Sequence, residues 1–261
     1  MKYFLDFKKE INKIVQKLSS NDFLMNDEKN DFKNVIDIVQ SIVVNRDEAL
    51  SLLFNMKDDE IVASISYLYN DVLNSKVFID DLFKMSAYKF VAFEIVLYTL
   101  ANLLLMDKFD LMHRIISNKY FKFEYSVVKE VSFYDSFGIR PEHTCNISKM
   151  GVSAADDYVV LKLIEKRLNK DYVFLSDLKS CDLLINDCAV LSEQDYIPYF
   201  ILSGEAALLA HAIGKRIADD DSSVFSLLGL KNKNELKEKL NSLGKIVVYK
   251  RMYAVGKYID L

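Results

Sequence analysis

The segment from Phe90 to Met106 constrains this chain most, because it is almost entirely apolar yet carries the carboxylate of Glu94 and the amide of Asn102. At roughly 17 residues it is near the short limit for crossing a hydrocarbon layer of about 30 Å. A charged group near the middle of such a minimal span is costly. We therefore expect a buried central helix, and no membrane segment.

The rest of the first half also reads as helices. Hydrophobic residues make up 51% of the chain, while its 261 residues include 7 Gly and 2 Pro, which is typical of long regular elements with few turns. Apolar residues recur at three- and four-residue spacing, the period of one helical face. Asp47 is a candidate N-cap for a short helix over 49–56. The predicted helices cover residues 4–18, 32–43, 49–56, 58–72, 79–85, 90–106 and 111–117.

The pattern changes near residue 119. Apolar and polar residues alternate from Tyr125 to Phe133, which predicts a half-buried strand, and a second strand-like run covers 246–249. We expect these two runs to pair in a small sheet. Helical patterns fill much of the remainder, over residues 154–168, 175–191, 199–217, 224–228 and 235–243.

The sequence therefore predicts a mainly α protein, either a multi-helix bundle or an irregular helical stack, with a small two-stranded sheet in its second half. We place a boundary near residue 119. It divides the chain into a helical unit, 1–118, and a mainly helical unit with short strands, 119–261.

Charge and cysteine usage indicate the compartment more than the partner. The net charge of -4 is too small to select an acidic or a basic partner through its long-range field. Three cysteines in a chain with a large core fit a reducing compartment better than a disulfide framework. The N-terminus enters an amphipathic pattern without an apolar signal region. We expect a cytoplasmic protein.

The loop from Gly138 to Gly151 gathers the residue types of a catalytic site, including His143 and Cys145. A nucleophilic cysteine needs a base within hydrogen-bond reach and usually a third group that orients the base. No such signature surrounds the pair, so we expect a connecting loop and assign no catalytic residue.

Metal and cofactor sites have equally little support. Cys181 and Cys188 lack the close ligand spacing of zinc sites, and the acidic run Asp219 to Asp221 is explained by the start of a helix. No glycine-rich phosphate loop or dinucleotide fingerprint occurs. We expect neither metal nor cofactor. If ATP is involved, a partner subunit supplies the ATPase.

Nucleic-acid binding is the alternative that charge placement favours. Lysines spaced by four form a basic stripe on the predicted helix over 154–168, and a second basic cluster lies near the C-terminus with tyrosines interleaved. Such a combination contacts phosphates and stacks bases. A solvated lysine face is the usual explanation for such a stripe. The candidate residues are Lys162, Lys166, Arg167, Lys170, Lys250 and Arg251.

The order of features over residues 125–243 resembles the helical C-terminal regions of poorly characterised bacterial antiphage-defence proteins. The resemblance begins with a helix that carries Ser, Ala and Asp near its start and leads to a basic end. It continues through a segment with Phe and Leu and a Cys-Asp-Leu-Leu core, and it closes on an aromatic-Pro stretch. It implies membership in a multi-gene defence system and no catalytic residue. The residues that carry it are Ser153, Ala155, Asp156, Lys166, Arg167, Phe174, Leu178, Cys181, Asp182, Leu183, Leu184, Tyr196, Pro198 and Tyr199.

Two classes of function follow from these observations. The first is a non-enzymatic accessory or scaffold subunit that binds other proteins, among them an ATPase or nuclease subunit. Its support is the aromatic-rich helices, with 17 Phe and 15 Tyr, together with the missing catalytic motifs. The second is a nucleic-acid-binding protein or nuclease that uses the basic residues above.

Overall fold

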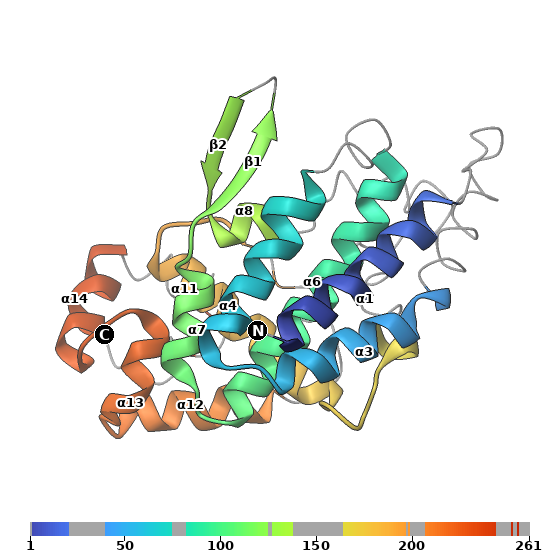
Figure 1. The fold of residues 1–261 in the computed structure, drawn as a ribbon. Helices are drawn as coiled ribbons and strands as arrows, with labels where there is room; N and C mark the ends of the chain where they lie inside the picture. The colour runs from blue at the N-terminus through green and yellow to red at the C-terminus, as the bar shows by residue number, and fades with distance from the viewer. Residues whose placement is uncertain are drawn as a thin grey trace, which may run out of the picture. The chain divides into compact units, whose positions relative to one another are not determined.

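The chain is mainly helical, with a two-stranded antiparallel sheet in the part that the structure describes (Figure 1). This confirms the predicted fold class. The structure is a computed structural model. The residues that it describes are 2–20, 40–74, 82–124, 127–137, 164–196, 198, 207–243, 252 and 255.

Two compact units make up the chain, and each is built from two separate segments. Unit 1 consists of Met1–Thr99 and Lys119–Asn169, and unit 2 consists of Leu100–Asn118 and Lys170–Leu261. The sequence analysis predicts a single boundary, near residue 119. That division into 1–118 and 119–261 stays a prediction.

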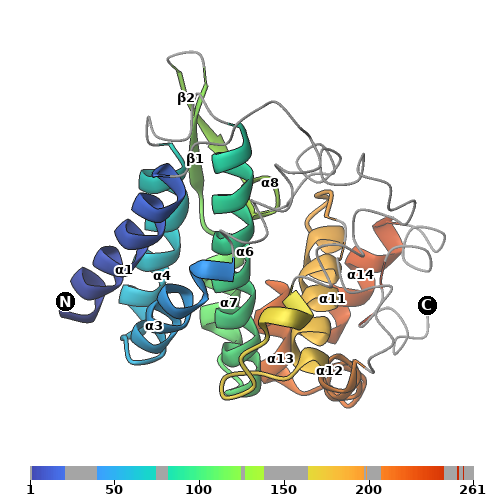
Figure 2. The same cartoon turned by 90° about the vertical axis from the view of Figure 1, so that its right-hand side faces the viewer.

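Helices α1 (Lys2–Ser19) and α3 (Val43–Phe54) pack along each other in unit 1, and α4 (Asp58–Tyr67) lies beside α1 (Figure 2). Polar side chains link α1 to α3, since Asn45 donates from Nδ2 to Glu10 at 3.1 Å and accepts at Oδ1 from Lys17 at 2.8 Å. The apolar positions of α1 that are buried are among those predicted from the spacing, namely Phe7, Ile11, Ile14 and Leu18.

Helix α4 begins at Asp58, as predicted, and continues into the π-helix η1 (Leu68–Leu73). Acidic side chains in the first turn of α4 favour the positive end of the helix dipole. The backbone N–H of Lys57 donates to the Glu60 carboxylate at 3.4 Å, which occupies a donor at the helix start. The apolar residues that recur at helical spacing in the predicted helix 58–72 are buried, namely Ile61, Ile65, Leu68, Tyr69 and Val72.

The predicted N-cap at Asp47 is wrong. Helix α3 starts four residues earlier, at Val43, so Asp47 lies inside the helix and caps nothing. Its carboxylate instead accepts hydrogen bonds from Arg46 and Asn169. Most of the helix predicted over 32–43 lies outside the described residues.

The apolar segment forms the long helix α6 (Leu82–Leu105). Among the described residues, one stretch, Ala87 to Leu105, is long and apolar enough to cross a membrane, and most of it is buried inside the protein. Such burial is the behaviour predicted for a core helix. Within unit 1, Tyr88 of α6 donates to the Leu68 carbonyl at 3.0 Å.

The sheet is a hairpin in unit 1, formed by β1 (Tyr120–Glu124) and β2 (Val127–Val131) and followed by α8 (Phe133–Phe137). The expectation of one half-buried strand over 125–133 is wrong in two respects. The strand of that region is shorter, and its residues 127–130 are exposed. Its partner is β1, whereas the predicted partner, 246–249, lies outside the described residues.

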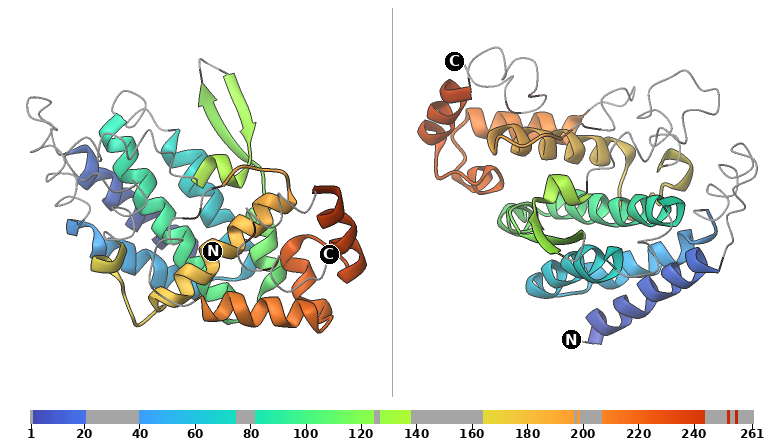
Figure 3. Two further views of the ribbon diagram at one scale, coloured as in Figure 1. Left: turned by 180° about the vertical axis from the view of Figure 1, so that it is seen from behind. Right: turned by 90° about the horizontal axis from the view of Figure 1, so that it is seen from above.

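Unit 2 is arranged around helix α11 (Leu175–Leu191), whose predicted bounds are confirmed. This helix contacts α12 (Leu208–Ala218), α14 (Lys233–Leu243) and the 3-10 helix η2 (Ser226–Leu228) (Figure 3). Helix α7 (Phe109–Ile116) also packs on η2. The short helix α13 (Ser222–Phe225) precedes η2.

A glycine at the end of η2 allows α7 to approach closely. Gly229 has φ +70°, in the left-handed region, and a Cβ there would lie 2.6 Å from Cε1 of His113. We expect Gly229→Ala to lower the free energy of unfolding by about 1–3 kcal/mol, because it adds both backbone strain and a steric clash. Urea-induced unfolding followed by circular dichroism measures this loss.

The double variant Gly229→Ala with His113→Ala separates the two causes. Because His113→Ala removes the clash and keeps the backbone strain, Gly229→Ala should cost less stability in the His113→Ala background than in the wild type. Equal losses from Gly229→Ala with and without His113 would show that the ring contact contributes nothing.

Candidate functional site

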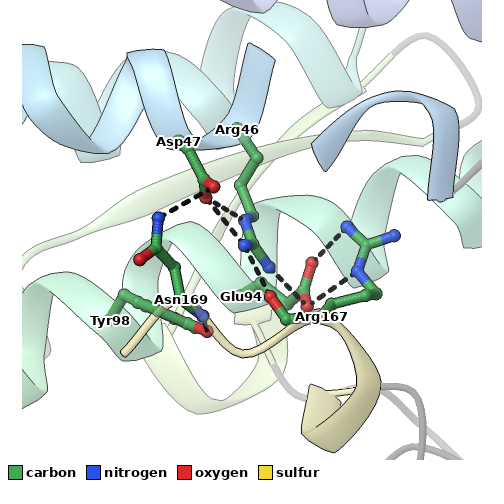
Figure 4. A network of polar contacts seen from close by, with 6 residues as sticks. All are labelled: Arg46, Asp47, Glu94, Tyr98, Arg167 and Asn169. Atoms are coloured by element: carbon green, nitrogen blue, oxygen red, sulfur yellow. Dashed lines mark hydrogen bonds and ion pairs between the residues drawn. The ribbon is translucent and has the colours of Figure 1, made fainter. Parts of the chain in front are cut away.

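Three charged side chains meet inside unit 1, from segments far apart in the sequence (Figure 4). Arg46 comes from α3, Glu94 from α6, and Arg167 from the helical residues 164–167. All three side chains are fully buried. Glu94 accepts from Arg46 Nη1 at 3.1 Å and from Arg167 Nε and Nη2 at 3.1 and 2.7 Å. Arg167 therefore binds both carboxylate oxygens, the bidentate geometry that guanidinium favours.

A second ring of contacts surrounds these three residues. Arg46 Nη2 donates to the Arg167 carbonyl at 2.8 Å, and Arg46 Nε and Nη2 donate to Asp47 at 2.9 and 2.7 Å. Asn169 donates from Nδ2 to Asp47 at 3.0 Å, and its backbone N–H donates to the Tyr98 hydroxyl at 3.2 Å. The segment 164–169 is thus tied to α3 and α6 by main chain as well as side chain.

The charges of this cluster balance, since Arg46 and Arg167 face Glu94 and Asp47. Burial is the largest single influence and lowers the pKa of Arg46, but Glu94, Tyr98 and Asp47 together outweigh it and raise that pKa overall. For Arg167, burial together with Arg46 lowers the pKa against the opposing effect of Glu94. Arginine remains protonated throughout the ordinary pH range. The two arginines therefore supply fixed positive charges that hold three segments together.

The predicted nucleic-acid residues separate in the structure. Lys166 and Lys170 are exposed, whereas Arg167 is 3% exposed and engaged with Glu94. Helical periodicity explains the separation, because adjacent helix positions point about 100° apart. Nucleic-acid binding stays a prediction and would depend on the lysines. Lys162, Lys250 and Arg251 lie outside the described residues, as does the loop from Gly138 to Gly151 with His143 and Cys145.

Helix α11 buries polar groups in unit 2. The Tyr196 hydroxyl donates to Asp182 at 2.6 Å, and the Val255 backbone N–H donates to Asp187 at 2.5 Å. Burial raises the pKa of both the Cys181 and the Cys188 thiols, so neither is an activated nucleophile. Among the described residues no three His, Cys, Asp or Glu side chains are grouped to hold a metal ion.

The acidic run Asp219 to Asp221 ends in a helix cap. Asp221 is the N-cap of α13, and its Oδ1 accepts from the Ser223 N–H at 3.0 Å and hydroxyl at 2.7 Å. Arg216 Nε donates to Asp221 Oδ2 at 2.8 Å. The hydrogen bonds from Ser223 and then Arg216 lower the pKa of Asp221 to about 2. The interpretation of this run as a helix start holds for Asp221.

The surface of unit 1 carries apolar side chains on the hairpin. Its base is fixed by Tyr120, which is fully buried and contacts the ring of Tyr69 edge-on, with centroids 5.9 Å apart. Farther along, Phe121 is 42% exposed, Val127 55% and Val128 61%. Sequence reasoning missed this surface, because the alternation in the second strand suggested burial on one face. An anchored strand pair with exposed apolar side chains is suited to binding a protein.

Comparison of the chain with protein-family models, curated proteins and solved structures gives no match.

The buried cluster predicts a large effect of a small change. We expect Glu94→Gln to lower the free energy of unfolding by about 3–5 kcal/mol, because two buried guanidinium groups then share one neutral amide. Chemical denaturation of the full chain measures the loss. The matched control is Glu238→Gln, at an exposed position of α14. Its free energy of unfolding should stay within about 0.5 kcal/mol of the wild type. Equal effects of the two changes would contradict the assigned role of Glu94.

The cap at α13 predicts a pH dependence. The folded pKa of Asp221 is about 2, below its ordinary 3.8, so its contribution to stability is complete above pH 4 and is lost as the pH falls toward 2. Asp221→Asn should therefore be less stable than the wild type at pH 7, and the difference should shrink toward pH 2. Thermal unfolding across this range tests it, and a difference that does not vary with pH would contradict the ionic contribution.

Proposed function

We propose that this chain is a non-enzymatic accessory or scaffold subunit of a bacterial multi-protein system and that it binds a partner protein through the hairpin of unit 1. The observation that carries the proposal is the exposure of Phe121, Val127 and Val128 on strands whose base is anchored by Tyr120. Exposed apolar side chains on a supported element lower the entropy lost on binding, because the surface is already formed.

The pairing of buried charged residues within the protein supports the same proposal. The best-defined charged cluster of unit 1, around Glu94, is neutral and has its donors directed at acceptors within the protein. Arg46 and Arg167 join α3 and the segment 164–169 to α6, in the same unit that carries the hairpin. In unit 2, the buried carboxylates of Asp182 and Asp187 accept from Tyr196 and from the backbone of Val255.

The kind of system is inferred from the resemblance over residues 125–243, which favours antiphage defence with an ATPase or a nuclease as the partner subunit. We place the protein in the cytoplasm. Support comes from Cys181 and Cys188, which are free thiols in the core of unit 2, and from the burial of the apolar helix α6.

Nucleic-acid binding is the second candidate, favoured by the exposure of Lys166 and Lys170, which are four residues apart in the chain. Binding of this kind depends on counterion release, so it weakens steeply as salt rises. That property separates it from the apolar contact proposed for the hairpin.

The test is recovery of partners by a tagged full-length chain expressed from its native operon. We expect the wild type to retain a neighbouring gene product in fixed stoichiometry. The double variant Phe121→Ser with Val128→Ser should lose it. A control double variant, Val44→Ser with Leu208→Ser, removes apolar side chains elsewhere that are even more exposed, and it should retain the partner.

Two outcomes would contradict the proposal. One is equal partner recovery by both double variants, which would remove the hairpin from the interface. The other is the recovery of DNA or RNA without protein, with binding that falls steeply with salt and is weakened by Lys166→Glu with Lys170→Glu.

A further inference from the structure

Two asparagine side chains hold one residue of β1 by its backbone. The Phe121 N–H donates to Asn70 Oδ1 at 2.8 Å, and the Phe121 carbonyl accepts from Asn74 Nδ2 at 2.6 Å. Phe121 lies opposite Glu130 in the register, and its backbone groups point away from β2, so the two residues form a non-hydrogen-bonded pair. The asparagine side chains therefore occupy the backbone groups that this ladder leaves unpaired. We call these two side chains the amide clamp.

The amide clamp comes from a helical turn that is itself tied to the core of unit 1. Asn70 lies in the π-helix η1, and Asn74 directly follows the last residue of η1. The hydroxyl of the buried Tyr88 of α6 donates to the carbonyl of Leu68, the first residue of η1, at 3.0 Å. Turns of π-helix are rare and occur frequently at functional sites. The position of Phe121 is thus set by α6 through η1.

The outer part of the hairpin needs such support. A two-stranded hairpin by itself is marginally stable in water, and residues 127–130 of β2 are exposed. The side chain of Phe121, which is 42% exposed, belongs to the surface that is proposed to bind a partner. A hairpin held at this residue presents its apolar side chains in one arrangement, so less conformational entropy is lost when the partner binds.

The two amides of the clamp have opposite roles. Asn70 accepts a hydrogen bond through its oxygen, whereas Asn74 donates through its nitrogen. The Asn74 nitrogen also donates to the Asn70 carbonyl at 3.0 Å. An ionised carboxylate accepts hydrogen bonds and donates none. Aspartate can therefore replace Asn70, but at position 74 it would place a negative charge against carbonyl oxygens.

We infer that the amide clamp positions the hairpin for its partner. When both hydrogen bonds are made, the exposed apolar side chains keep the arrangement that the partner binds. When they are broken, the outer part of the hairpin moves while its base stays anchored at Tyr120. Asn70 and Asn74 are positioning residues, which act through Phe121. This inference rests on the proposed function and identifies the residues that set the geometry of that interface.

Hydrogen exchange at single amides of the full chain, followed by NMR, tests the clamp directly. In Asn74→Asp the Phe121 amide should exchange about tenfold faster than in the wild type, or more, because the strand opens at that residue. In Asn70→Asp it should exchange as in the wild type, since the carboxylate accepts the same hydrogen. The buried Val91 of α6 reports the folding of the unit, and its amide should stay slow in both variants. Equal Phe121 exchange in the two variants would overturn the inference.

Two further variants separate the lost donor from the added charge. Asn74→Leu removes the donor without adding a charge, so it should speed Phe121 exchange even if Asn74→Asp unfolds the unit. Asn12→Asp, at an exposed position of α1, makes the same change of charge as Asn74→Asp and should leave Phe121 exchange unchanged. Wild-type exchange at Phe121 in Asn74→Leu, with Val91 still protected, would overturn the inference.

Partner recovery by the tagged, operon-expressed chain distinguishes this inference from the proposed function. Recovery that is kept by Asn70→Asp and reduced about tenfold by Asn74→Leu would support both. Full recovery by Asn74→Leu, in spite of fast exchange at Phe121, would leave the proposed function in place and overturn the positioning role. The expected exchange pattern in a chain that recovers no partner would support the clamp as the support of the hairpin and count against the proposed function.

Discussion

The burial of one carboxylate, Glu94, determines how unit 1 is held together. An unpaired charge in a protein interior is strongly unfavourable, so an apolar helix that carries one must bring cations to it. Arg46 and Arg167 meet this requirement, and they come from positions 48 and 73 residues away. The contacts that neutralise Glu94 therefore also bind α3 and the segment 164–169 to α6.

The hairpin depends on the same unit for its support but has a different chemical character. Tyr120 is buried against Tyr69, and Asn70 and Asn74 occupy the edge of β1 at Phe121. These contacts position the strands and protect one edge, while the side chains of residues 127–130 stay exposed. Among the described residues, one edge of the sheet is capped at Phe121 and no strand pairs with the other edge.

Sequence patterns predicted individual helices well where each one forms by local rules. Leu175–Leu191 has the predicted bounds, and the buried residues of α1 follow the predicted spacing. The errors arose where a tertiary contact competes with a local signal. Asp47 has the chemistry of an N-cap, but its carboxylate pairs with Arg46 and Asn169, and α3 continues through it. Alternation along the second strand suggested burial, because a short strand has the same period in a core and in an exposed hairpin.

The sequence by itself determined the mainly helical class and the central apolar helix, because amphipathic spacing and scarce Gly and Pro act through local backbone preferences. It also showed that Glu94 would need an explanation inside that helix. Only the tertiary structure decided that Arg167 is buried and paired with Glu94, while its neighbour Lys166 is exposed. It also decided that the Phe121 backbone is capped by Asn70. Both results depend on residues distant in the sequence, whose proximity no local pattern encodes.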